Sequence, residues 1–170
     1  TPYGTKSCDT VVGYTLNNIK FLLNQGAELI VIACNTASSV ATAPVLKQFS
    51  VPIFEVITPA VELAVQTSKN LNFGIIGTRA TITSGIYEKK IIENQPRASV
   101  YSVACPLLVP LVEEGWLDRA ETAMIVKKYL RPLKTRQIDT LILGCTHYPL
   151  LKNVIQRKIG STGCINCPGN

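Results

Sequence analysis

Apolar residues recur along this chain with two different periods, and each period predicts one kind of element. Short apolar runs indicate buried strands at residues 29–33, 51–56, 72–77 and 140–144, and a segment of alternating character indicates a further strand at residues 99–104. Apolar residues three or four positions apart predict helices at residues 5–24, 36–49, 58–68, 78–94, 118–133 and 149–158. Strands and helices therefore alternate along the chain, which is typical of an α/β protein with mostly parallel sheets flanked by helices.

Residues at the ends of these segments suit their expected places. Gly26 follows the first helix, and Thr58 with Pro59 fits the N-cap and first position of the third. Asp118 suits the N-cap of the long helix that follows it. At residues 57–58 a finished strand–helix–strand unit meets a new one, so we expect a domain boundary there.

The composition is that of a folded domain. Of the 170 residues, 46% are hydrophobic and 16% are charged, which supports a substantial core and argues against disorder. The apolar runs are too short to cross a bilayer, and residues 1–6 lack the apolar segment of a secretory signal. We therefore expect a cytoplasmic protein with no membrane partner.

The chain carries a formal net charge of +6, from 17 Lys and Arg against 11 Asp and Glu. The densest basic groups lie on expected helices, at residues 127–128, 131–136 and 152–158. They lack the run of interleaved aromatic residues that a base-stacking platform needs. A solvated helix face therefore explains them better than a nucleic-acid site, and no nucleic-acid partner is expected.

Six cysteines stand at positions 8, 34, 105, 145, 164 and 167. A disulfide framework is typical of shorter secreted chains, so we do not expect one here. Cys164 and Cys167 form a C-x-x-C motif, but zinc would need a second pair, and thioredoxin-like chemistry expects the motif between an early strand and a helix. A thiol redox protein acting through this pair stays open as an alternative.

Cys34 and Cys145 occupy similar positions in the pattern. Each directly follows an apolar strand, and each is followed by small or hydroxyl-bearing residues that suit the start of a helix. In open α/β sheets the ligand crevice lies at the carboxyl ends of the strands, so both thiols are expected at a crevice. A helix N-terminus stabilises negative charge, which favours the thiolate.

Paired thiols suit the removal of a proton from a carbon next to a carboxylate. One thiolate takes the proton, and a thiol on the opposite face returns another. The alternative is that both are buried small hydrophobic residues, as free cysteines usually are, and we interpret Cys8 and Cys105 in that way. His147, the only histidine, stands two residues after Cys145 and suits tuning of that thiol or proton transfer.

Two further groups are open to more than one interpretation. Glu113 and Glu114 suit either a solvated turn or a carboxylate that orients a catalytic group. Thr78 and Thr81, after Gly77, resemble a hydroxyl-rich anion loop at a helix N-terminus. The chain has neither a G-x-G-x-x-G fingerprint nor a P-loop. We expect no nucleotide, flavin, pyridoxal phosphate or metal cofactor.

In these motifs the chain resembles the glutamate racemases, cofactor-independent enzymes that supply D-glutamate for bacterial peptidoglycan. The matching segments follow the family order and spacing across residues 1–160 and comprise residues 2–4, 6–7, 34–38, 105–107, 109–115 and 144–151. Aspartate racemases share the two-cysteine plan but typically continue the second cysteine with Thr-Glu, whereas Thr146 and His147 follow Cys145 here. The alternatives are a racemase of another acidic amino acid, such as aspartate, and a non-catalytic binding protein of the same fold.

The resemblance implies a role for each candidate residue. Cys34 would act on the D-enantiomer and Cys145 on the L-enantiomer, with Glu113 and His147 assisting the Cys145 thiol. The residues implied to hold the glutamate substrate are Tyr3, Gly4, Asn35, Thr36, Thr146 and His147, with Thr78 and Thr81 as further candidates. The resemblance also implies two similar α/β domains with the active site between them, and a homodimer in the complete enzyme.

Two departures from the family pattern predict that the chain is a fragment. Family members begin with an Asp-Ser-Gly segment that has no counterpart before Thr1, and they continue well past the last helix. We expect residues 1–57 to form part of the first domain, residues 58–165 the second domain, and residues 166–170 the start of the return to the first. Such a fragment is expected to be marginally stable and weakly active or inactive, because an incomplete sheet leaves an unpaired edge.

Overall fold

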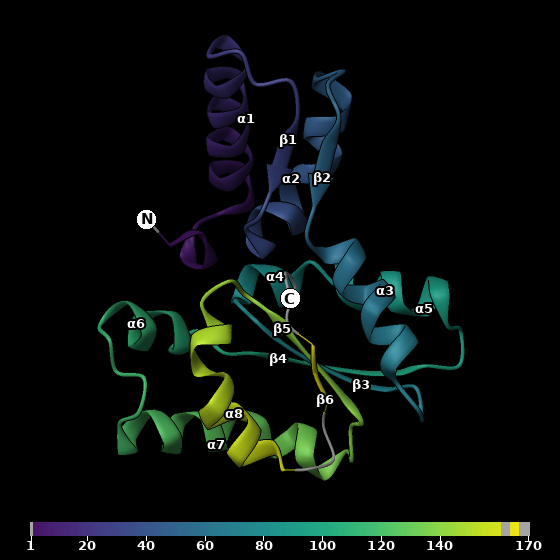
Figure 1. Ribbon diagram of the computed structural model, residues 1–170, viewed down its shortest axis with the longest axis vertical. Helices are drawn as coiled ribbons and strands as arrows, with labels where there is room; N and C mark the ends of the chain where they lie inside the picture. Colours follow the sequence, from purple (N-terminus) through teal and green to yellow (C-terminus); the bar gives the residue numbers. More distant parts are fainter. Residues whose placement is uncertain (1, 161–163, 167–170) are drawn as a thin grey trace.

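The computed structural model describes residues 2–160 and the backbone of residues 164–166, and its strands form two separate parallel sheets (Figure 1). The smaller sheet pairs two strands and packs against two helices in the upper part of Figure 1. The elements of this unit, in chain order, are η1 (Tyr3–Thr5, a 3-10 turn), α1 (Cys8–Asn24), β1 (Ile30–Ile32), α2 (Asn35–Gln48) and β2 (Ile53–Glu55).

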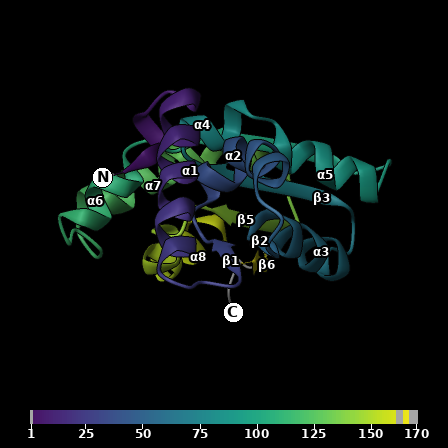
Figure 2. The same cartoon turned by 90° about the horizontal axis from the view of Figure 1, so that it is seen from above.

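The larger sheet has four parallel strands in the order β4-β3-β5-β6. Its strands are β3 (Asn72–Gly77), β4 (Ser99–Ala104), β5 (Thr140–Gly144) and β6 (Cys164–Asn166). The elements around it are α3 (Ile57–Thr67), α4 (Arg79–Thr83), α5 (Ile86–Asn94), α6 (Leu108–Glu113), α7 (Ala120–Thr135), η2 (Tyr148–Leu151) and α8 (Lys152–Ile159). Seen from above in Figure 2, the smaller unit overlies this sheet. The predicted α/β class with parallel sheets and flanking helices is confirmed.

Neighbouring residues of the central strands face opposite helical layers. Phe73 and Ile75 of β3 pack with α3 and α5, whereas Ile76 points into the core formed with α6, α7 and α8. The same alternation holds in β5, where Ile142 faces the first layer and Leu143 the second. A strand buried on both faces needs apolar side chains at every position, which explains the continuous apolar runs in the sequence.

The helix predicted at residues 78–94 is wrong as a single element. It divides into α4 and α5 at Gly85, whose φ of +65° lies in the left-handed region. Glycine has no Cβ and adopts this conformation without strain, so it ends one helix and precedes the next. The break carries Tyr87 on a separate helix, which matters for the site described below.

Two predicted helix starts are also wrong. α3 begins at Ile57 rather than at Pro59, and the Glu55 carboxylate accepts hydrogen bonds from the backbone amides of Ile57 (2.5 Å) and Thr58 (3.0 Å). At α7 the N-cap position is Arg119, which makes no side-chain cap, while Asp118 lies 3.7 Å from Arg157 of α8. In neither case does the residue expected from the sequence cap the helix. The Glu55 carboxylate binds the first amides of α3, and Asp118 contacts Arg157 instead of the start of α7.

The ends of the first and last predicted helices differ as well. The first begins at Cys8, so Cys8 is its first residue rather than an interior one, and the Ser7 hydroxyl accepts from the Thr10 amide. The last begins as the 3-10 turn η2 before α8 continues it.

The strand at residues 164–166 pairs with β5, so it belongs to the larger sheet. The domain limits at 57 and 165 stay a prediction, and residues 167–170 lie outside the described part of the chain.

The outer face of the smaller sheet exposes large apolar side chains. Val31 of β1 is 59% exposed and its neighbour Phe54 of β2 is 56% exposed. The opposite face of β1 buries Ile30 and Ile32 against α1 and α2. The smaller sheet therefore has one covered and one uncovered face. Within the described residues, no helix is both long enough and apolar enough to span a membrane.

Candidate functional site

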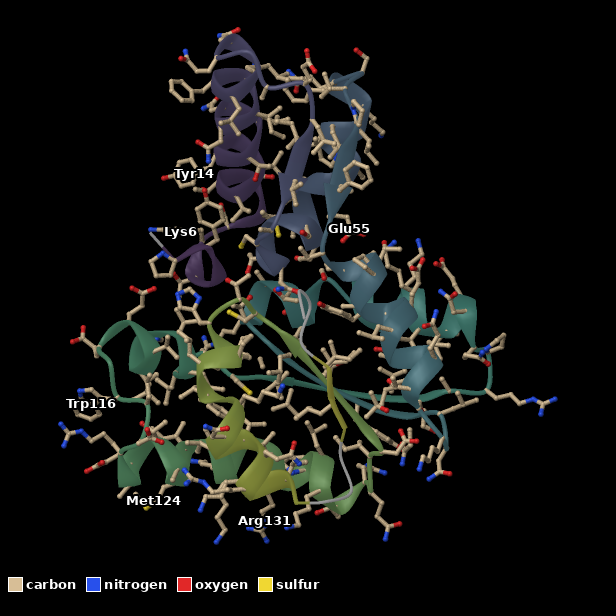
Figure 3. All side chains as sticks on the ribbon, viewed as in Figure 1. Lys6, Tyr14, Glu55, Trp116, Met124 and Arg131 are labelled. Atoms are coloured by element: carbon tan, nitrogen blue, oxygen red, sulfur yellow. The ribbon has the colours of Figure 1, made fainter. Side chains whose placement is uncertain are left out.

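A cavity of about 40 Å³ lies between the two units, at the carboxyl ends of β1 and β5. It is lined by Pro2, Tyr3, Gly4, Cys34, Asn35, Thr36, Thr78, Val109, Cys145, Thr146 and His147. Lys6 and Glu55, labelled in Figure 3, mark the level at which the two units meet. Every candidate site residue from the sequence lines this cavity except Glu113, which contacts a lining residue, and Thr81, which supports two of them. Pro2 and Val109 line it in addition.

Cys34 lies where the smaller sheet delivers the chain to a helix. It follows β1 and occupies the N-cap position of α2, and its carbonyl accepts a 2.8 Å hydrogen bond from the Ser38 amide. Its side chain is half-buried and lines the cavity.

Cys145 is in a drier environment. It follows β5 directly and is 7% exposed. Burial raises the pKa of the Cys145 thiol to about 11, although the backbone amide of His147 donates to the sulfur and lowers it. The expectation that the turn after β5 favours the thiolate is therefore wrong for Cys145, because desolvation outweighs the nearby amides.

His147 links the Cys145 thiol to a carboxylate. Its Nδ1 lies 3.8 Å from the Cys145 sulfur, and its Nε2 lies 2.5 Å from Oε1 of Glu113. Glu113 is the last residue of α6, so a helix end brings the carboxylate to a turn 34 residues away in sequence. The contact fixes the orientation of the imidazole, and Glu113 rather than Glu114 makes it.

Three threonine hydroxyls connect the two units beside the cavity. Thr36 Oγ1 lies 2.9 Å from Thr78 Oγ1 and 3.3 Å from Thr81 Oγ1, and the last two lie 3.0 Å apart. Thr36 belongs to α2 of the smaller unit, whereas the other two belong to the start of α4. All three side chains are buried, so the triangle is a buried polar junction between the two units.

Asn35 presents a donor that the protein does not use. The residue is 2% exposed, its Oδ1 accepts a 2.5 Å hydrogen bond from the Tyr87 hydroxyl, and its Nδ2 has no partner among the described residues. A buried amide nitrogen without an acceptor is costly, so a ligand acceptor in the cavity would stabilise it. Tyr87 was not predicted, because a tyrosine on an apolar helix face is typical of core packing.

The η1 turn closes one side of the cavity. Tyr3 and Gly4 line it, and a Cβ on Gly4 would lie only 2.7 Å from Cβ of Thr78. Glycine is therefore needed for the turn to approach the larger unit this closely. Thr146 lines the cavity beside Cys145.

The remaining described cysteines lie outside the cavity lining. Cys8 is exposed on α1, and Cys105 is fully buried, with a pKa that burial raises to about 12. The Cys105 thiol contacts the Val103 carbonyl at 3.5 Å, which fits the structural interpretation given to it. The side chain of Cys164 and all of Cys167 lie outside the described part of the chain.

A group of basic residues lies at the far end of the larger unit. Five of them line a separate groove of about 300 Å³ between α7 and α8, namely Lys127, Arg131, Lys134, Arg157 and Lys158. Arg131 is labelled at the lower edge of Figure 3, remote from the cavity between the units. Among residues 2–160, no three His, Cys, Asp or Glu side chains are grouped so that they could hold a metal ion.

Comparison with known proteins places this geometry in a family. Residues 4–166 match the family described as Asp/Glu/Hydantoin racemase. The glutamate racemase of Persephonella marina is 50% identical over 156 residues, which are 92% of this chain and 60% of that protein. The glutamate racemase of Aquifex pyrophilus is 47% identical over 165 residues, which are 97% of this chain and 64% of that protein.

Solved structures have the same fold. A glutamate racemase isoform from Bacillus anthracis matches with a TM-score of 0.94 and 38% identity, covering 98% of this chain and 63% of that one. Glutamate racemase from Francisella tularensis in complex with D-glutamate matches with a TM-score of 0.91 and 37% identity, covering 99% and 62%. The chain spans 60% and 64% of the two curated relatives above. With a family match over residues 4–166 and this sequence identity, the chain belongs to the Asp/Glu/Hydantoin racemase family.

Proposed function

We propose that the protein carrying this chain interconverts L-glutamate and D-glutamate by proton transfer at the α-carbon. The observation that carries this proposal is the meeting of Cys34 and Cys145 in one cavity, each delivered by the carboxyl end of a different sheet. Two acid/base groups from opposite walls suit a reaction that removes a proton on one face and adds one on the other. The names of the relatives support glutamate as the substrate.

In the proposed reaction a thiolate accepts the α-proton and a thiol gives one up. For D-glutamate, the Cys34 thiolate takes the proton, negative charge spreads onto the substrate carboxylate, and the Cys145 thiol protonates the opposite face. The raised pKa of Cys145 suits the protonated partner in this direction. For L-glutamate the roles reverse, and His147, held by Glu113, positions the Cys145 sulfur.

Exchange of the α-hydrogen in deuterium oxide tests the proposal. The full-length protein should exchange and racemise both glutamate enantiomers, as followed by NMR and circular dichroism. Cys34→Ser and Cys145→Ser should each lower racemisation by at least about 100-fold, the contribution expected of a positioned acid or base. Cys8→Ser, at an exposed thiol outside the cavity, is the matched control and should keep full activity. Racemisation retained by either active-site variant would refute the two-base mechanism.

The same measurement separates the alternative functions. Faster exchange with aspartate than with glutamate would identify a racemase of another acidic amino acid. Glutamate binding without exchange would identify a non-catalytic binding protein. In the proposed function, D-glutamate would supply peptidoglycan synthesis, and the complete enzyme would form a homodimer, which light scattering can test.

We further propose that residues 1–170 alone are weakly active or inactive. The exposed Val31 and Phe54 on the smaller sheet support this, because such an apolar face is typical of a surface that further chain covers. Circular dichroism and the racemisation assay on residues 1–170, beside the full-length protein, provide the test. Equal activity of the two polypeptides would contradict it.

A further inference from the structure

Tyr87 touches both cysteine-bearing turns although it does not line the cavity. Its hydroxyl donates a 2.5 Å hydrogen bond to Oδ1 of Asn35, the residue that follows Cys34. Its ring packs against Gly144, the residue that precedes Cys145, because a Cβ on that glycine would lie 3.2 Å from Cε2 of Tyr87. One side chain on α5 thus connects the end of β5 with the start of α2.

The hydrogen bond to Asn35 decides which end of that amide is free. A side-chain amide has one acceptor oxygen and a nitrogen with two hydrogens, and rotation by half a turn exchanges them. With the Tyr87 hydroxyl donating to Oδ1, the oxygen is satisfied and Nδ2 is the end without a partner. Since Asn35 lines the cavity, the free donor is available to an acceptor there, such as a carboxylate oxygen.

The surroundings of Tyr87 keep its hydroxyl protonated, so it has a hydrogen to donate. The side chain is 2% exposed, and burial raises its pKa, with the negative charge of Glu55 acting in the same direction. The hydroxyl therefore stays protonated at neutral pH. The protonated phenol donates to Oδ1 of Asn35, and this hydrogen bond is the contact that leaves Nδ2 without a partner.

We propose that Tyr87 is a positioning residue for substrate binding, which orients the Asn35 amide with Nδ2 toward the cavity. The proposal rests on the proposed function, in which an acidic amino acid occupies this cavity. Tyr87 acts through Asn35 and touches no substrate atom, so its effect should fall on substrate affinity. Its contact with Gly144 fixes the ring against the strand that carries Cys145.

Tyr87→Phe in the full-length protein isolates the hydroxyl and keeps the ring. The expected result is a KM for glutamate about 10-fold higher in both directions, with kcat changed by less than about threefold, because the lost orientation weakens substrate and transition state alike. Asn35→Ala should raise KM similarly, and adding Tyr87→Phe to it should raise KM by less than about twofold, since the hydroxyl then has nothing to orient.

A matched control removes a hydroxyl elsewhere. The Tyr129 hydroxyl accepts a hydrogen bond from the Leu107 amide at 3.4 Å, and neither residue lines the cavity. Tyr129→Phe should therefore leave KM unchanged. Additive effects of the Tyr87 and Asn35 substitutions, or a KM for Tyr87→Phe equal to that of the wild type, would overturn the proposal.

A second readout does not depend on catalysis. NMR of protein labelled at asparagine should show the Asn35 side-chain signals of the substrate-free wild type move when Tyr87 is replaced by Phe, because the oxygen loses its donor. Unchanged Asn35 signals would overturn the positioning role even in a protein without racemase activity. Failure of the wild type to exchange the α-hydrogen would instead overturn the proposed function, so the two failures are distinguishable.

Discussion

The Cys145 thiol should react with iodoacetamide more slowly than an ordinary cysteine at neutral pH. Burial raises its pKa from 9.0 to about 11. Below pH 9 a shift of two units lowers the thiolate fraction by about 100-fold. A thiolate of higher pKa is the stronger nucleophile, and a Brønsted coefficient of about 0.4–0.5 restores roughly 6- to 10-fold. The net reduction is therefore roughly 10- to 15-fold, before any protection from the surrounding side chains.

Short alkylation pulses between pH 7 and pH 10 provide the measurement. Isotope-coded reagent and peptide mass spectrometry give a rate for each cysteine of the full-length protein, with a small cysteine amide as the reference thiol. The Cys145 rate should rise about tenfold per pH unit across the whole range, because its pKa lies above it. Cys105, fully buried and with a pKa near 12, should react more slowly still.

Two outcomes would refute this reasoning. A Cys145 rate that levels off at or below pH 9, or one equal to that of the reference thiol, would mean that the sulfur is not desolvated. His147→Ala provides a control, since the hydrogen bond that lowers the Cys145 pKa comes from the backbone amide of residue 147. The variant keeps that amide, so the slope with pH should persist.

Three further predictions concern stability and geometry. Gly4→Ala would place a Cβ 2.7 Å from Thr78 and push the η1 turn away, so kcat/KM should fall by roughly 10- to 100-fold. Gly13→Ala is the control, because a Cβ there would meet no atom within 4 Å. It should keep activity and raise the free energy of unfolding, measured in urea, by up to about 1 kcal/mol. Burial raises the pKa of Asp139, but hydrogen bonds from the Asn70 amide, the Ser68 hydroxyl and the Lys69 amide outweigh this effect, and the net pKa is lowered. Asp139→Asn should therefore lower the free energy of unfolding by about 1–2 kcal/mol in urea at pH 7. The loss should be smaller below pH 4, where the wild-type carboxylate also becomes protonated. Because the pKa values of the buried Cys105 and Cys145 thiols are raised, the folded protein keeps protons that the unfolded chain releases above about pH 9. Tm should therefore be level from pH 7 to 8.5 and fall at higher pH. A Tm that rises above pH 8.5 would contradict the raised pKa values of these thiols.

The central strands could be predicted from the sequence, and the helix ends could not. The predicted bounds of β3, β4 and β5 agree with the structure; β3 and β5 are buried on both faces and apolar almost throughout, whereas β4 has exposed and partly buried positions. The start of α3 depends on the Glu55 carboxylate, and the split at Gly85 depends on a left-handed backbone. Neither leaves a signal in the spacing of apolar residues.

The same division holds for the candidate site. The positions of Cys34 and Cys145 at strand ends follow from a rule about open α/β sheets, whereas a shared site between two domains is an expectation from the resemblance to the racemases. The state of the Cys145 thiol depends instead on how many atoms surround it, and the contact between Tyr87 and Asn35 joins residues 52 positions apart. Properties set by packing between distant segments need the folded chain.

The threonine triangle gives the junction between the two units a property that a carbonyl acceptor would not. The hydroxyl groups of Thr36, Thr78 and Thr81 contact one another, and in each pair either oxygen can be the donor, while the Thr78 oxygen also accepts a 3.2 Å hydrogen bond from the Thr81 amide. The three hydroxyl hydrogens can therefore point around the triangle in either direction while the oxygen–oxygen distances stay the same. When Thr36 or Thr78 donates its hydroxyl hydrogen to an anion in the cavity, the other two hydroxyls can reorient so that all three oxygens remain hydrogen-bonded. Reversing the hydroxyl donors at this junction between the units therefore requires no movement of a heavy atom.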